Sequence, residues 1–167
     1  MAKWGSCDYE QFKQLQERLQ KLERIDLDKF CRDVSKELAA RLLALVIPRT
    51  PVGVYTEDTG KKGGTLRRGW TGGKNSSAKA YAQSLPVHKA GHTFTIEVIN
   101  PVEYASYVEF GHRQTPGRFV PAIGKSLKAS WVDGQYFLTI SEDELRQMAP
   151  AVIQRKLDEL LREVFNG

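Results

Sequence analysis

The sequence contains few cysteines, methionines and histidines. Its 167 residues include two cysteines, two methionines and three histidines. Cys7 and Cys31 lie far apart in the chain, so their spacing predicts neither a disulfide framework nor a CxxC metal site. We expect both thiols to be reduced and Cys31 to be buried. The three histidines leave few candidates for a general base or a metal ligand.

Long apolar runs are also missing. The longest one, residues 38–47, spans ten positions and contains Arg41, whereas a membrane-spanning helix needs about 20 apolar residues. The first ten residues, MAKWGSCDYE, have no apolar segment followed by a small-residue cleavage site. We therefore expect no membrane partner, no secretion signal and an intracellular origin.

The remaining composition is that of a folded domain with a basic middle. Hydrophobic residues make up 41% and charged residues 27% of the chain, which are ordinary values, and the length predicts a single domain over residues 1–167. The formal charge is +5, and residues 48–135 hold 12 basic and 6 acidic side chains. Such an excess favours a polyanion such as DNA, although solubility alone explains many similar cases.

Two helices are predicted over residues 8–47. In the first, apolar residues recur three and four positions apart up to Leu22, with Asp8 placed to cap the helix. The second begins after Asp26 and carries a longer apolar stripe that ends at Pro48, so it should be the main core helix. The first helix is narrower on its apolar side. It lies on the surface, meets a neighbouring copy or packs on its own subunit.

A sheet region over residues 66–140 is predicted, with long loops at 48–65 and 111–130. Both loops are dense in glycine, proline and polar residues and have no apolar periodicity. The clearest strand is residues 92–100, where apolar and polar side chains alternate. Gly91 before it suits a turn.

The other elements of the middle region have weaker patterns. Residues 66–71 are compatible with a strand, and residues 101–111 favour a short helix, with a strand as the alternative. Asp133-Gly134 resembles a hairpin turn that would add a strand at residues 135–140.

A C-terminal helix is predicted over residues 141–165. Ser141 and Glu144 form a capping-box pattern ahead of a long apolar stripe. The element order thus indicates an α+β fold, in which long N-terminal helices and a C-terminal helix pack on a small antiparallel sheet with long loops.

Catalytic motifs are not apparent. His88 and His92 flank a glycine that precedes a strand, so they should not share a helical face as metal ligands do, and His112 lies in a predicted loop. Residues 124–126, GKS, resemble the end of a phosphate-binding loop, but Phe119 stands where its first glycine is required. We predict no enzyme activity, no metal and no cofactor. A small hydrolase with an unrecognised site is the weakest alternative.

Three passages together resemble one family. The first joins RTPV (49–52), DTG (58–60) and LRRGW (66–70), the second is NPVEYASYVEFGHR (100–113), and the third is PGRFVPA (116–122). They are similar to the "TP-V-DTG-LRRSW" segment, the "YA-YVEFGTR" signature and the following loop of the small tail-component family of tailed bacteriophages. The second match is the most specific. The chain differs by an insertion before Leu66, by Gly69 in place of serine and by His112 in place of threonine.

The resemblance implies a structural protein of the virion, assembled in the host bacterial cytoplasm. It implies a tail-completion or head-tail joining (neck) subunit that forms a six- or twelve-fold homo-oligomeric ring. Its neighbours would be head-tail connector, tail terminator or tail tube proteins, with DNA in the channel. The family offers no catalytic residues to transfer. The alternative is a soluble basic adaptor that binds DNA or protein alone.

Two groups of site residues follow. Aromatic and arginine side chains are favoured at buried interface cores, although Tyr104 and Val108 could equally fill the subunit core. The candidates for a subunit interface are Tyr104, Tyr107, Glu109, Phe110, His112, Arg113 and Phe119. The basic residues either pair with neighbouring carboxylates or face DNA or another ring. These are Arg49, Lys61, Lys62, Arg67, Arg68, Lys74 and Arg118.

Overall fold

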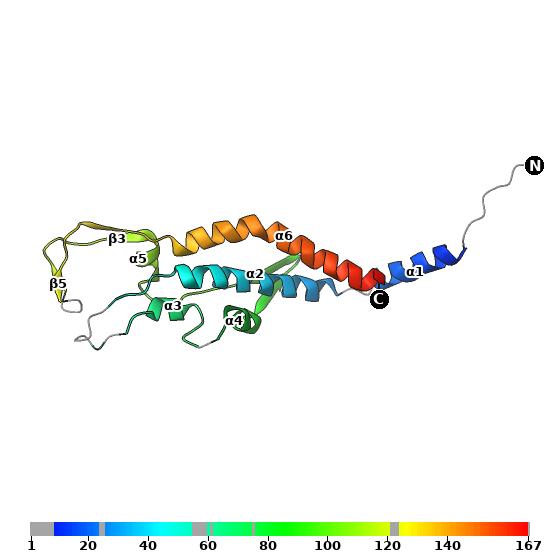
Figure 1. The fold of residues 1–167 in the computed structure, drawn as a ribbon, viewed down its shortest axis with the longest axis horizontal. Helices are drawn as coiled ribbons and strands as arrows, with labels where there is room; N and C mark the ends of the chain where they lie inside the picture. Colours follow the sequence, from blue (N-terminus) through cyan, green and yellow to red (C-terminus); the bar gives the residue numbers. More distant parts are fainter. Residues whose placement is uncertain are drawn as a thin grey trace, which may run out of the picture.

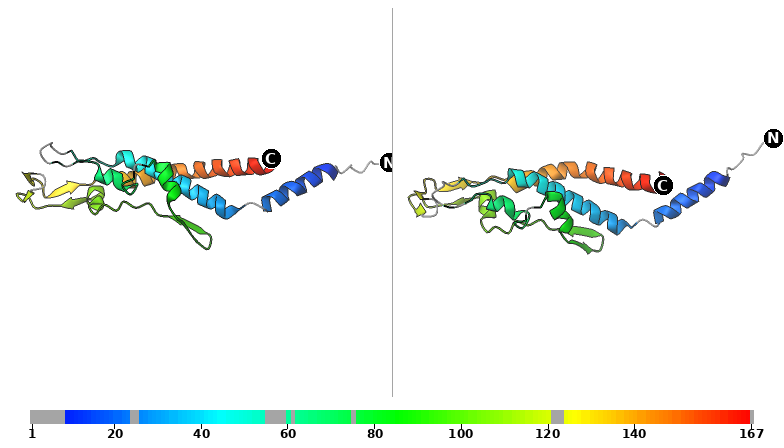
Figure 2. Two further views of the ribbon diagram at one scale, coloured as in Figure 1. Left: turned by 90° about the horizontal axis from the view of Figure 1, so that it is seen from below. Right: turned by 60° about the horizontal axis from the view of Figure 1, so that its bottom comes forward.

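The molecule is elongated, with two long helices lying side by side along its middle (Figure 1). They are α2 (Leu27–Arg49) and α6 (Phe137–Asn166). At one end α1 (Tyr9–Glu23) continues outward, and at the other end a β arm projects beyond the helices (Figures 1 and 2). The computed structural model describes residues 9–23, 26–54, 60, 62–74, 76–120 and 124–166.

Shorter elements fill the chain between α2 and α6. They are α3 (Thr65–Gly69), α4 (Ala78–Ser84), β1 (Val87–Ala90), β2 (Thr93–Ile96), α5 (Ala105–Phe110), β3 (Gly111–Arg113), β4 (Phe119–Val120), β5 (Lys125–Ser126) and β6 (Trp131–Asp133). The α+β class is confirmed. The strands, however, form three separate antiparallel pairs, β1–β2, β3–β6 and β4–β5, where one small sheet was expected over residues 66–140. Three helices interrupt that region, so its short strands pair only locally.

The core lies where α2 meets α3, α4 and the start of α6. Leu43 and Val46 of α2 are fully buried there. Trp70 follows α3 and packs edge-to-face on Phe137, with ring centroids 6.3 Å apart. The indole Nε1 of Trp70 donates a hydrogen bond to Thr50 Oγ1 at 2.8 Å. This bond satisfies the only polar atom of the ring inside the core.

Helix α2 begins as predicted but ends later. Asp26 caps it, since its Oδ1 accepts a hydrogen bond from Lys29 N at 2.9 Å. The predicted stop at Pro48 is wrong, because the helix continues through Pro48 to Arg49. A proline in the last turn removes only one helical hydrogen bond, and Thr50 closes the turn through its N–H bond to Val46 O. Cys31 is partly exposed, where burial was expected.

Two short helices, α3 and α4, form where the sequence pattern is strand-like or polar. Residues 66–71 were predicted as a strand, but Leu66 belongs to α3 and Trp70 caps it. Both side chains are buried, as the i,i+4 spacing on one helical face allows. Residues 72–80, GGKNSSAKA, are mostly small and polar, yet α4 begins there, with Ser77 Oγ accepting a hydrogen bond from Ala80 N.

The β1–β2 hairpin rests on α2. The predicted strand at residues 92–100 is confirmed over Thr93–Ile96, with Phe94 and Ile96 turned inward, and Gly91 lies in the turn with φ 59°. Its partner β1 was missed. Arg32 Nη1 of α2 donates to Val87 O at 2.8 Å, and its guanidinium lies over the Phe94 ring.

The predicted hairpin at Asp133-Gly134 is wrong. β6 pairs instead with β3, which comes twenty residues earlier, in the register Gly111↔Asp133 and Arg113↔Trp131. Residues 135–140 therefore do not form a returning strand, and α6 starts at Phe137. The predicted capping box also fails, because Ser141 lies inside α6 and donates from Oγ to Phe137 O.

The two predicted loops differ in outcome. Residues 50–54, 60 and 62–64 have neither helix nor strand, the ends of the first predicted loop belong to α2 and α3, and residues 55–59 and 61 lie outside the described residues. The second loop, residues 111–130, contains β3, β4 and β5, so the loop prediction was wrong there. No helix in the described part of the chain is long and apolar enough to cross a membrane. The predicted cap Asp8 also lies outside the described residues.

Candidate assembly surfaces

Two of the passages that resemble the tail-component family, residues 66–70 and 100–113, pack against each other. Asn100 Nδ2 donates a hydrogen bond to Leu66 O at 2.8 Å, and Asn100 Oδ1 accepts one from Val102 N at 3.2 Å. A Cβ atom on Gly69 would meet Asn100 Oδ1 at 2.2 Å. Glycine at this position therefore lets the Asn100 side chain reach α3. The segment before α5 is fixed to the core by this contact.

Glu109, at the end of α5, caps α6 from a distance in sequence. Its side chain is buried, with 3% exposure. Its carboxylate accepts hydrogen bonds from Leu138 N and Thr139 N, both at 2.9 Å, and from Thr139 Oγ1 at 2.7 Å. These are orphan donors of a helix N-terminus, where a negative charge is favourable. The structure thus places Glu109 inside the subunit, and its predicted interface role remains a prediction.

Gly111 ends α5 and starts the arm. Its φ is 83°, and a Cβ there would meet Val132 O at 2.4 Å and Gly134 N at 2.9 Å. Only glycine fits both the backbone conformation and the close approach of β3 to β6. Together with the Glu109 cap, this turn determines where the arm leaves the helical body.

The aromatic residues of the α5 segment point outward. Tyr104, Tyr107 and Phe110 are exposed, and Val108 packs against the core. The alternative that Tyr104 fills the core is therefore wrong. Val108 is partly buried against the core, so the same alternative is partly right for Val108. His112 is partly buried, and its ring lies 5.7 Å from the Tyr107 ring.

An apolar hollow of about 400 Å³ lies between α5 and the start of α6. Its walls include Ile99, Val102, Phe110 and Leu138. Ile99 and Phe110 are both largely exposed. The hollow and the exposed aromatic side chains of α5 therefore form one apolar surface at the base of the arm.

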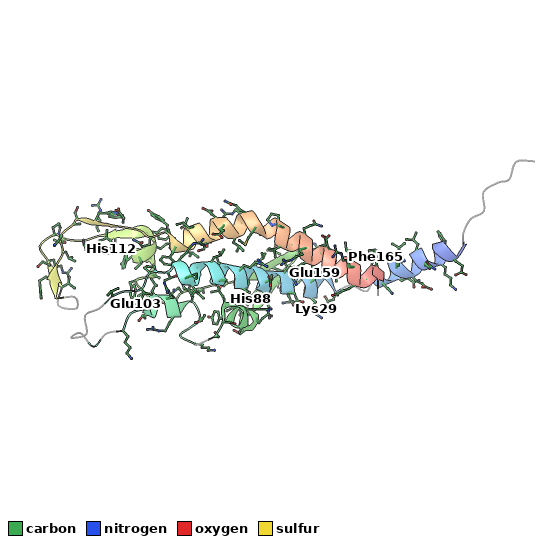
Figure 3. The ribbon with its side chains drawn as sticks, viewed as in Figure 1. Lys29, His88, Glu103, His112, Glu159 and Phe165 are labelled. Atoms are coloured by element: carbon green, nitrogen blue, oxygen red, sulfur yellow. The ribbon has the colours of Figure 1, made fainter. Side chains whose placement is uncertain are left out.

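The β arm, residues 111–120 and 124–133, combines aromatic and basic side chains. Phe119 and Trp131 are exposed, and so are Arg113 and Arg118. The two strand pairs of the arm project beyond the helical body (Figure 1). Figure 3 shows His112 at the base of the arm and His88 beside the middle of α2, so these histidines share no site.

The predicted basic residues divide into two groups. Arg49 pairs with Glu144, Arg67 donates to the carbonyls of Pro48 and Thr50, and Arg68 donates to Gly63 O. These three arginines hold the ends of α2 and α3. The side chains of Lys62, Lys74 and Arg118 are exposed, and Lys61 lies outside the described residues.

A second apolar surface lies at the opposite end of the molecule, on α1. Phe12, Leu15 and Leu19 are between 50% and 62% exposed. They form the predicted stripe of the first helix, which leaves the body instead of packing along it (Figure 2). Of the alternatives left open for this helix, the structure shows a surface position, with contacts to α6. Sequence periodicity found the stripe but could not show that it is uncovered.

No group of three or more histidine, cysteine, aspartate or glutamate side chains in the described ranges could hold a metal ion. The apolar and aromatic surfaces are thus the main features that the described residues present.

The comparison with protein families settles the identity at family level. A family model described as "Bacteriophage HK97-gp10, putative tail-component" matches residues 13–111, more than half of the chain. The chain belongs to this family. No curated protein and no solved structure gives a significant match. The protein is accordingly a bacteriophage tail component and part of the virus particle.

The family match covers a defined part of this tail component. It runs from within α1 to Gly111, and so includes the α5 segment with Glu109. The β arm beyond Gly111 and the whole of α6 lie outside the match. The tail component therefore combines a family portion with an arm and a helix that the family model does not cover.

Proposed function

We propose that this tail component is a structural, ring-forming subunit that completes the tail or joins it to the head, linking the tail to the connector. The observation that carries the proposal is the exposure of large apolar side chains at both ends of an elongated subunit. Phe12, Leu15 and Leu19 lie at one end, and Phe110, Phe119 and Trp131 lie at the other.

Two different apolar ends suit assembly in a closed ring. Soluble monomers rarely leave large contiguous apolar surfaces uncovered, so both ends are expected to be buried in the particle. Neighbouring subunits of a ring meet through heterologous contacts, which close into a ring when the rotation between the subunits closes. Six- or twelve-fold symmetry would match the family resemblance.

The arm is the part best suited to reach neighbouring rings. It projects beyond the helical body (Figure 1), and it carries Arg113, Arg118, Phe119 and Trp131 in exposed positions. Aromatic and arginine side chains are enriched at the centres of protein interfaces. We assign the arm and the α5 aromatics to contacts with connector, tail terminator or tail tube proteins.

A mass measurement tests the ring directly. Light scattering or native mass spectrometry of the purified chain, alone and mixed with particle components, should give a defined multiple of the 18.9 kDa subunit. Electron micrographs of that species should show closed rings. A chain that stays monomeric at every concentration and never joins a particle would contradict the proposal.

Proximity to DNA is a separate part of the proposal, supported by the exposed Lys62, Lys74 and Arg118. If these side chains face the channel, binding of duplex DNA to the ring should weaken steeply as salt rises, since phosphate contacts release counterions. A triple alanine variant of these residues should lose that binding and keep the ring mass. DNA binding by a monomer alone would favour the alternative of a basic adaptor.

A further inference from the structure

The α1 helix has the side-chain pattern of a coiled-coil strand. Its large apolar residues Phe12, Leu15, Leu19 and Leu22 follow the spacing three, four, three, which is the a and d pattern of two heptads. The first three are at least half exposed in the single subunit. Leu22, at the end of the helix where α1 contacts α6, is partly buried. The seam is therefore largely uncovered at Phe12, Leu15 and Leu19 by the described residues of its own chain.

The other face of α1 is polar throughout. Lys13, Glu17 and Lys21 succeed one another at i,i+4 spacing on the outward side of the seam, an arrangement that supports a solvent-exposed helical face. A helix of 15 residues is marginal in water without tertiary contacts. Burial of the seam against another helix would supply those contacts.

The charges beside the seam point to one occupant and one orientation. With Phe12 at position a, the sequence places Arg18 at g and Glu23 at the following e. In a parallel pair a g residue meets the next e residue of the partner, so Arg18 of one copy would meet position 23 of the other. An antiparallel pair would put glutamines opposite both charges. The complementarity therefore favours a parallel partner with the same sequence.

We propose that α1 associates in parallel and in register with α1 of a second copy, through the seam at Phe12, Leu15, Leu19 and Leu22. This inference rests on the proposed ring, which supplies the second copy. Cyclic symmetry relates equivalent helices by a rotation alone, so α1 helices that run along the ring axis are parallel and in register. The orientation that the charges favour is thus the one that a ring requires.

Disulfide trapping tests the register. In the full chain with Cys7 and Cys31 replaced by alanine, Phe12→Cys should form a disulfide with Phe12→Cys of another copy under mild oxidation. The outward-facing Lys13→Cys is the matched control and should remain largely monomeric on a non-reducing gel. In an antiparallel pair position 12 lies opposite position 22, about 15 Å away from its equivalent at a rise of 1.5 Å per residue. Absence of the Phe12→Cys disulfide would overturn the proposal.

Charge exchange tests the partner. Arg18→Glu alone and Glu23→Arg alone should each weaken self-association about twofold to fivefold at low salt, and the double exchange should restore it. Leu15→Glu with Leu19→Glu should remove the association while circular dichroism of the remaining fold stays close to wild type.

The outcomes separate this inference from the ring itself. A wild-type chain that is monomeric overturns the proposed ring. A ring that keeps its mass in the Leu15→Glu/Leu19→Glu variant overturns the α1 inference alone. A ring that this variant breaks, without any Phe12→Cys disulfide in the trapping experiment, means that the seam covers another part of the neighbouring subunit and also overturns the parallel pairing.

Discussion

Two tryptophans show how differently the helical body and the β arm are built. Trp70 is 2% exposed and its indole N–H is satisfied by Thr50 Oγ1, whereas Trp131 is 48% exposed on a short strand of the arm. Trp70 has α2 on one side and Phe137 of α6 on the other. Trp131 belongs to the two-stranded β3–β6 ladder, which lies beyond the ends of α2 and α6 (Figure 1). The body buries this large aromatic side chain in its core, and the arm leaves its own tryptophan exposed.

The largest effect should come from removing the body's tryptophan. Trp70→Ala should lower the free energy of unfolding by about 3–5 kcal/mol, as expected for an aromatic side chain that leaves a core cavity. It also leaves the buried Thr50 hydroxyl without its donor. Urea unfolding followed by circular dichroism measures the change.

Trp131→Ala is the matched control in the arm. It should change the free energy of unfolding by no more than about 0.5 kcal/mol, as for an exposed residue outside special contacts. It should instead reduce incorporation into particles if the arm binds neighbouring proteins. Equal destabilisation by the two variants would contradict the division between body and arm.

A second test uses two glycines of the arm with nearly identical backbone angles. Gly111 has φ 83° and Gly117 has φ 82°, but only at Gly111 would a Cβ meet other atoms. Gly117→Ala should cost about 1–2 kcal/mol from the left-handed conformation alone. Gly111→Ala should cost about 2–4 kcal/mol, because it adds the clash with Val132 O.

Thermal melts of the two glycine variants measure this difference. A cost at Gly111 equal to that at Gly117 would mean that β3 and β6 separate easily at this point. The arm would then be poorly fixed to the body, and the boundary between body and arm would have to be placed at α5.

The Glu109 cap joins the two regions, so its removal should have an intermediate effect. Glu109→Ala leaves the N–H groups of Leu138 and Thr139 without their acceptor, which should cost about 2 kcal/mol. Glu103→Ala, in an exposed position just before α5, should be nearly neutral. Hydrogen exchange should report faster exchange at the first turn of α6 in the Glu109 variant alone.

The sequence predicted the parts of the fold that depend on local periodicity. α1, α2 and most of α6 follow from apolar spacing, and Asp26 was placed correctly at the start of α2. The wrong strand at residues 66–71 had a detectable signal, since Leu66 and Trp70 are four apart and share a helical face. The start of α6 had no capping signal in the nearby sequence, because its cap is Glu109, which belongs to α5.

The candidate surfaces could be predicted only in part. The signature at residues 100–113 identified the family and drew attention to Tyr107 and Phe110, which are exposed. Composition could not show that Arg67 is engaged by backbone carbonyls while Lys62 is exposed, since both are basic residues close together in the sequence. Exposure depends on tertiary neighbours, and those contacts join residues far apart in the chain.

The smallest effect is expected at the β1–β2 hairpin, which is a two-stranded ladder like the arm but rests on α2. Lys89 pairs with Asp28, and both side chains are more than a third exposed. Exposed ion pairs contribute about 0–1 kcal/mol, so Lys89→Ala should lower the free energy of unfolding by less than about 1 kcal/mol. Both variants lose a cation contact with the Phe94 ring. Arg32→Ala should cost more, because it also removes the partly buried hydrogen bond to Val87 O. Urea unfolding of the two variants measures the order, and the reverse order would mean that the hairpin is held by its surface charge and not by its covered face.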